Sequence, residues 1–130
     1  MRKWGPLVLA PFLGFLAMLL PALLRQPSRQ AMESVHALVR TAVKHVGPWN
    51  FVLLLLVGAF LGAISSWRTL VLGAAAMLLF PALAVTEMIS DSTSHNLWPL
   101  EFLMYAFYGC VVAAGAVLLR RVGGREGRSR

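Results

Sequence analysis

The chain has 130 residues, of which 58% are apolar and only 13% charged. A soluble domain typically has about 45–50% apolar and about 25% charged residues. The low charge excludes a disordered chain, which combines low hydrophobicity with many charges. It also argues against a water-soluble globule, because too few polar side chains exist to cover a surface. The composition therefore predicts an integral membrane protein whose surroundings are the lipid bilayer.

The charge is strongly basic, with 12 Lys and Arg against 5 Asp and Glu and a net charge of +7. These basic residues lie at the ends of apolar segments, whereas nucleic-acid binding requires a clustered basic face. We therefore interpret them as determinants of topology and of contact with anionic lipid, and we expect no nucleic-acid partner. The single cysteine, Cys110, can form neither an internal disulfide nor a multi-cysteine zinc site.

The first predicted span covers residues 4–24. Arg2 and Lys3 precede an apolar run, as they would in a signal peptide. The run is, however, about as long as the roughly 20 residues of a membrane-spanning helix, and no A-x-A-like cleavage site follows it. We expect a retained span in which Pro11 kinks the helix or leaves a carbonyl free for a neighbour.

An amphipathic helix is predicted over residues 28–46. Apolar residues recur there at spacings of three and four, and charged residues occupy the opposite face. A basic amphipathic helix between two spans is expected to lie in the headgroup plane, so we predict an interfacial helix that ends at Gly47-Pro48. A gate or a partner-binding helix is the alternative function of this segment. Its apolar residues are Met32, Val35, Leu38, Val39, Ala42, Val43 and Val46.

Three further spans are predicted, at residues 49–67, 69–86 and 99–119, followed by a flexible basic tail over 120–130. Each of the four tryptophans falls at an end of a predicted span, which is the preferred position of this residue at the membrane interface. The four tryptophans are Trp4, Trp49, Trp67 and Trp98.

The second span contains Gly58 and Gly62 at the G-x-x-x-G spacing, which lets two helix backbones approach closely. We expect this pair to mediate helix packing within the chain rather than between two copies.

The predicted fold is therefore a single all-α membrane domain. It has four transmembrane helices and an interfacial amphipathic helix between the first and the second. Four spans place both termini on one side, together with eight of the twelve Lys and Arg residues. The positive-inside rule then predicts cytoplasmic termini, and the inner (cytoplasmic) membrane if the host is bacterial.

The loop between the third and fourth spans carries most of the ionisable chemistry. It contains Glu87, Asp91 and Glu101, three of the five acids, together with His95. It contains no Lys or Arg, as expected of an outer loop. Ionisable groups near the hydrocarbon boundary are costly and usually have a partner or a function.

Several interpretations of this loop remain open. Pro99 and Glu101 fit the first turn of a helix, and the intervening polar residues are ordinary turn formers. Alternatively, Glu87, Asp91 and His95 align at spacings of four as a metal or proton site, with Glu101 from the facing helix as a further ligand.

An active site facing the outer compartment is a third interpretation. Ser92 or Ser94 would be the nucleophile, His95 the base and Asp91 its orienting partner. The sequence lacks the G-x-S-x-G motif that would support it. Tyr105 and Tyr108 follow Glu101 at one and two helical turns, where they could line a cavity or belong to the interfacial aromatic belt.

These features predict a small non-enzymatic subunit of a membrane complex or transport system. Its acidic outer loop would bind a cation, a proton or a partner, which would be another membrane subunit or a second copy. The alternative is a membrane-embedded enzyme acting on a lipid-linked substrate at the outer face. We expect no cofactor in either case.

Overall fold

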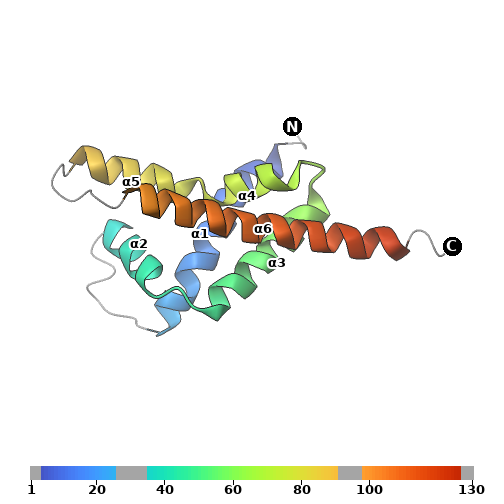
Figure 1. The fold of residues 1–130 in the computed structure, drawn as a ribbon, viewed down its shortest axis with the longest axis horizontal. Coiled ribbons are helices and arrows are strands. Elements are labelled where there is room, and N and C mark those ends of the chain that lie inside the picture. The colour runs from blue at the N-terminus through green and yellow to red at the C-terminus, as the bar shows by residue number, and fades with distance from the viewer. Residues whose placement is uncertain (1–3, 26–34, 91–97, 127–130) are drawn as a thin grey trace.

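The protein was analysed as a computed structural model that describes residues 4–25, 35–90 and 98–126. These residues form helices and no strand, in agreement with the predicted all-α class (Figure 1). The helices are α1 (Gly5–Arg25), α2 (Val35–Lys44), α3 (Pro48–Ile64), α4 (Thr69–Met77), α5 (Leu79–Ser90) and α6 (Trp98–Glu126).

Three helical stretches are long and apolar enough to cross a membrane: Gly5–Leu24, Thr69–Ile89 and Pro99–Gly123. They coincide with three of the four predicted spans. α3 has 17 residues, about 25 Å at 1.5 Å per residue, which is slightly less than a hydrocarbon core of about 30 Å. It reaches the length of a span only together with Ala37–Lys44, from which it is bent by 105°.

The outer surface of the candidate spans is apolar. Phe12, Leu70 and Leu103 expose 63%, 70% and 67% of their surface, respectively. Large contiguous apolar surface is rare on soluble monomers and is the normal lipid-facing surface of a membrane helix. The exposed side chains therefore support an integral membrane protein.

The third predicted span is interrupted at Leu78, which separates α4 from α5. Pro81 has no N–H and cannot donate to the carbonyl of Met77 four residues earlier. At the break, the Leu78 N–H bonds the Ala75 carbonyl at 3.2 Å, three residues back rather than four. The proline thus accounts for the break, and α5 continues to Ser90, beyond the expected end at residue 86.

The other helix boundaries also differ from the predicted ranges. α6 continues to Glu126, so residues 120–126 of the expected flexible tail are helical. The basic residues that follow Leu119 favour this extension, because cations are stabilised near a helix C-terminus. Residues 127–130, and residues 28–34 of the predicted interfacial helix, lie outside the described part of the chain.

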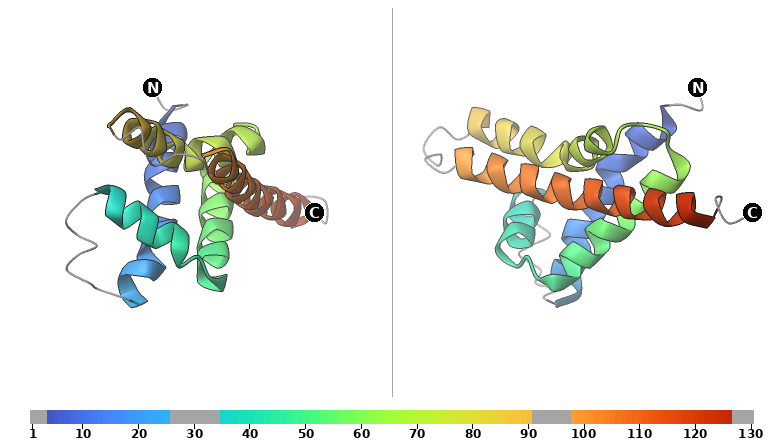
Figure 2. Two further views of the ribbon diagram at one scale, coloured as in Figure 1. Left: turned by 60° about the vertical axis from the view of Figure 1, so that its left-hand side comes forward. Right: turned by 45° about the vertical axis from the view of Figure 1, so that its right-hand side comes forward.

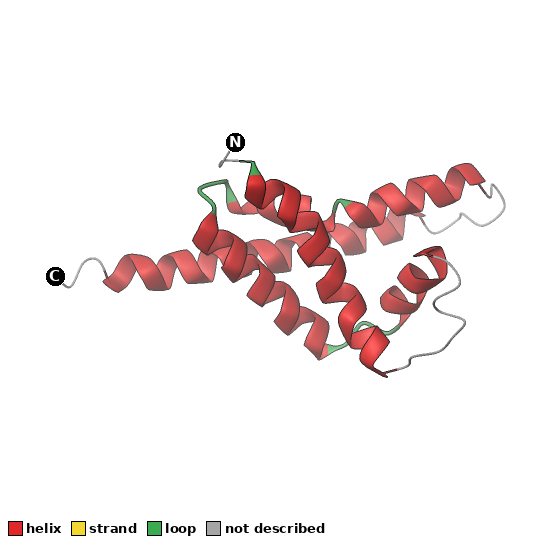
Figure 3. Ribbon diagram, turned by 180° about the vertical axis from the view of Figure 1, so that it is seen from behind, coloured by secondary structure: helices red, strands yellow, loops and turns green. Residues whose placement is uncertain are grey.

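The helices are arranged around α6. α4 and α5 run along α6, whereas α1 and α3 cross the α4–α6 layer obliquely (Figures 1 and 2). α2 lies beside α1, and its Ala42 packs with Leu19 and Ala22 of that helix. The view from behind shows α1 and α3 running side by side (Figure 3). The most extensive contacts of α6 are with α3 and α4.

Glycines occupy the points where the helix backbones are closest. A Cβ added at Gly58 of α3 would collide with the Val112 carbonyl of α6, and one at Gly62 would lie 2.9 Å from the Cα of Ala116. Both members of the G-x-x-x-G pair therefore face α6 of the same chain. Three further glycines make similar contacts: Gly14 against Ala76, Gly73 against Gly109, and Gly115 against Leu55.

Three segments meet at one end of the molecule. The Trp4 ring, at the start of α1, lies 5.1 Å from the ring of Trp67 in the α3–α4 turn. Arg120 of α6 donates hydrogen bonds to the carbonyl oxygens of Ser65 and Trp67 at 2.8 and 2.7 Å. Arg120 Nε also donates to the carbonyl oxygen of Gly62, in the last turn of α3, at 3.5 Å. The last carbonyls of a helix have no intrahelical donor, so the guanidinium supplies one where α3 ends at Ile64.

Candidate functional site

The two predicted acidic residues that the structure describes lie at the same end of the α5–α6 pair. Glu87 is in the last turn of α5, and Glu101 is in the first turn of α6. Both side chains are half-buried. The end of α5 and the start of α6 lie next to each other (Figure 1). Asp91 and His95 fall outside the described residues.

The metal interpretation remains a prediction. Among the described residues, no three His, Cys, Asp or Glu side chains gather closely enough to hold a metal ion. Two members of the proposed ligand set, Asp91 and His95, lie outside the described part of the chain. Glu101 has the position expected of a residue that complements the positive end of the α6 dipole.

Tyr105 and Tyr108 belong to an aromatic cluster inside the bundle rather than to an interfacial belt. Tyr105 is 5% exposed and stacks on Phe80 of α5, with ring centroids 5.2 Å apart. Tyr108 packs edge-on against Phe51 of α3 at 6.0 Å. Phe80 in turn contacts Phe15 of α1 at 5.4 Å. The cluster therefore joins four helices directly below the acidic end.

A groove of about 320 Å³ runs between the α4–α5 break and α6. Among the described residues that line it, Tyr105 alone has a side-chain oxygen. Pro81 lines the groove at the break, and Cys110 lines it from α6. The remaining lining residues are apolar: Leu70, Ala74, Met77, Leu78, Phe102, Ala106 and Gly109.

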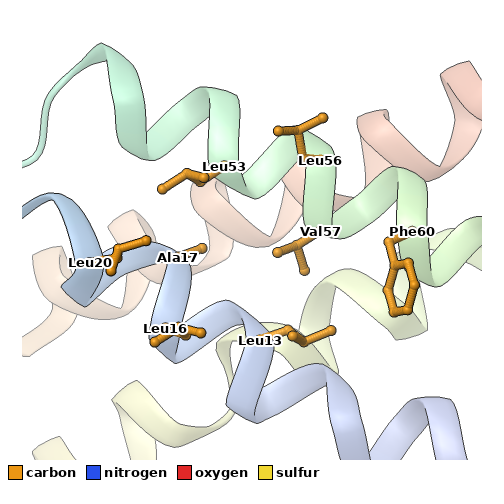
Figure 4. Close-up of a pocket in the computed structure, with 8 residues that line it drawn as sticks. All are labelled: Leu13, Leu16, Ala17, Leu20, Leu53, Leu56, Val57 and Phe60. Carbon is orange, nitrogen blue, oxygen red and sulfur yellow. The ribbon is translucent and has the colours of Figure 1, made fainter.

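A second groove, of about 240 Å³, lies between α1 and α3 and is apolar throughout. Figure 4 shows its side chains facing each other across the gap. Such a surface suits a lipid acyl chain or a neighbouring helix, and offers no group for chemistry. It is lined by Leu13, Leu16, Ala17, Leu20, Leu53, Leu56, Val57 and Phe60.

A buried polar connection between α1 and α3 was missed by the sequence analysis. Asn50 is 1% exposed, and its side-chain amide donates to the carbonyl oxygens of Met18 at 2.9 Å and Ala17 at 3.3 Å. Its side-chain oxygen accepts from the Gly47 N–H at 3.0 Å, as in a capping box. All three contacts tie the start of α3 to α1 and to the preceding turn.

Two sequence features point to this connection. Pro21 cannot donate to the carbonyl of Ala17 four residues earlier, so α1 leaves that oxygen without its helical donor. Asn50 is the polar residue in the first turn of an otherwise apolar helix. Freed carbonyls in membrane helices are commonly satisfied by a polar group of a neighbouring helix.

No protein-family model, curated protein or solved structure matches the chain.

Proposed function

We propose that this protein is a small multi-pass subunit of a membrane complex or transport system, and that it acts by binding rather than by catalysis. The observation that carries the proposal is the location of Glu87 and Glu101 at the same end of the α5–α6 pair. Charged groups at such a boundary are stabilised by a cation, a proton or a complementary partner. The acidic end is the surface through which the subunit engages that partner.

Four membrane crossings are part of this proposal. Trp4, Trp67 and Arg120 mark one end of the bundle. The Trp4 ring contacts the Trp67 ring, and the Trp67 carbonyl accepts a hydrogen bond from Arg120. That meeting supports a topology in which the N-terminus, the α3–α4 turn and the end of α6 share one side. The basic residues at this end favour the cytoplasm, and the acidic end then faces outward. α2 lies along the membrane surface as an interfacial helix.

The packing of the helices favours a subunit over an independent pore. Gly58, Gly62 and Gly73 place the backbones of α3 and α4 directly against α6. The backbones of α3 and α4 touch α6 at these glycines, so a wide aqueous path along the contacts would require the helices to separate. The apolar exterior is instead available to lipid, to other membrane subunits or to a second copy.

The test is purification of the tagged protein from its native membrane in mild detergent. We expect an integral membrane partner at a fixed ratio with the wild type. Glu101→Gln should reduce its recovery at least tenfold, because the charge is lost while the side-chain shape is kept. Glu126→Gln is the matched control, since it removes the same charge near the other end of α6.

Two results would contradict the proposal. One is a wild-type protein that purifies alone and binds no cation. The other is purified protein that turns over a lipid-linked substrate and loses this activity in Glu101→Gln, which would establish the enzymatic alternative.

A further inference from the structure

We propose that the groove between the α4–α5 break and α6 binds a neutral, lipid-soluble molecule that carries a carbonyl oxygen, with the Tyr105 hydroxyl as its hydrogen-bond donor. The groove is separate from the acidic residues of the proposed function. Neither Glu87 nor Glu101 lines it. The two proposals can therefore fail independently.

The Tyr105 hydroxyl is the first observation. Tyr105 is only 5% exposed, yet its hydroxyl makes no hydrogen bond with any residue that the structure describes. Within the same residues, no fully enclosed side-chain oxygen lacks a partner, so this hydroxyl retains an opening to its surroundings. Tyr105 lines the groove, and we assign the opening at its hydroxyl to this groove. A phenol surrounded by apolar groups gains from an external acceptor.

The shape of the groove is the second observation. Pro81 lines the groove at the α4–α5 break, and the small lining residues Ala74, Ala106 and Gly109 leave space in it. A volume of about 320 Å³ falls at the lower end of the range of about 300–1,000 Å³ that is typical of small-molecule sites. Mostly apolar walls with one fixed polar group are the usual composition of such sites.

The carboxylate of Glu101 near the groove favours a neutral ligand over an anionic one. Glu101 precedes Tyr105 by one helical turn on the same face of α6, so an anionic ligand such as a fatty acid is repelled. No described basic residue lines the groove to offset this repulsion. A neutral carbonyl needs only one donated hydrogen, and Tyr105 supplies it. The apolar remainder of the ligand contacts Met77, Leu78 and Phe102.

The experiment uses fluorine NMR of the full chain in phosphatidylcholine nanodiscs, with 3-fluorotyrosine in place of tyrosine. The chain has two tyrosines, so two resonances are expected, which Tyr105→Phe and Tyr108→Phe assign. The probe is 5-nonanone, and nonane is the matched compound without the carbonyl. We expect 5-nonanone to shift the Tyr105 resonance saturably and nonane to leave it in place. Tyr108 lies outside the groove, and its resonance should not move.

A second pair of variants tests the location of the site. Ala106→Leu fills the groove and should weaken the 5-nonanone response at least tenfold. Ala114→Leu is the control, because Ala114 is also exposed on α6 but does not line the groove.

Four outcomes would overturn the proposal. They are an unsaturable response, an equal response to nonane, a parallel shift of both tyrosines, and a Tyr105 resonance that depends on the protein-to-lipid ratio without added ketone. The last would show that a second copy of the chain occupies the groove.

Discussion

Asn50 of α3 donates a hydrogen bond to the backbone carbonyl of Ala17 in α1, the oxygen that Pro21 leaves without its helical donor. The amide also reaches the adjacent Met18 carbonyl at 2.9 Å. A proline in one helix and an amide in another thus form one structural unit. Because the bond to the Ala17 carbonyl is buried, leaving this oxygen without a donor is costly.

Asn50→Ala should lower the free energy of unfolding by about 1–3 kcal/mol, because buried backbone groups lose their partner. Pro21→Ala restores an N–H donor for the Ala17 carbonyl, so the same Asn50→Ala change should cost less in that background. A double-mutant cycle by denaturant titration in detergent micelles measures the difference. Strictly additive effects would show that Asn50 acts independently of the proline.

Gly58→Ala should destabilise the protein, because the new methyl group collides with the Val112 carbonyl of α6. We expect a loss of about 1–3 kcal/mol, typical of an overpacked interior. Gly123→Ala is the control, since nothing lies within 4 Å of its added Cβ. There, helix propensity alone predicts a gain of up to about 1 kcal/mol. Thermal unfolding that ranks the two variants in the opposite order would contradict the close contact of α3 with α6.

Arg120→Gln should loosen the α3–α4 turn, because the Ser65 and Trp67 carbonyls lose a charged donor. Arg68 is exposed in this turn and provides a trypsin cleavage site. We expect cleavage after Arg68 to become about fivefold faster, corresponding to about 1 kcal/mol of local stability. Arg121→Gln removes the neighbouring charge and should leave the rate unchanged. Equal rates in both variants would mean that net charge, rather than the hydrogen bonds, controls the turn.

Topology is tested by single cysteines introduced into a Cys110→Ala background. An impermeant maleimide should label Ser94→Cys from outside intact cells. It should not label Ser66→Cys in the α3–α4 turn, or Ser129→Cys near the C-terminus, because basic residues favour the cytoplasm. The opposite pattern would reverse the orientation. Outside labelling of Ser66→Cys alone would contradict the placement of this turn beside the N-terminus.

The sequence predicted well those features that depend on hydrophobic length. Apolar runs and terminal tryptophans located α1, the α4–α5 stretch and α6, because residues along a membrane span must be predominantly apolar. The G-x-x-x-G spacing identified two glycines that the structure places against α6. α3 alone is slightly shorter than a typical membrane span, so the proposal that it crosses the membrane rests on its helix contacts.

Features that depend on pairing between helices were not predictable in the same way. Pro81 was visible in the sequence, but whether a proline kinks or interrupts a helix depends on its neighbours. Asn50 and Arg120 were missed because their partners are backbone carbonyls more than 30 residues away. For the acidic loop, the sequence supplied candidate residues, and the structure places two of them, Glu87 and Glu101, at one end of the α5–α6 pair.

α6 follows α3 and the α3–α4 turn in the chain, so these elements are synthesised before the helix that packs against them. Arg120, Gly115 and Ala116 leave the ribosome after α3 and the α3–α4 turn, which they contact. Until α6 is inserted, the Ser65 and Trp67 carbonyls have no guanidinium donor and the glycine face of α3 has no neighbour in the chain. A chain truncated before Arg120 should therefore be recognised by membrane quality control as incompletely packed, even though every helix before α6 is intact.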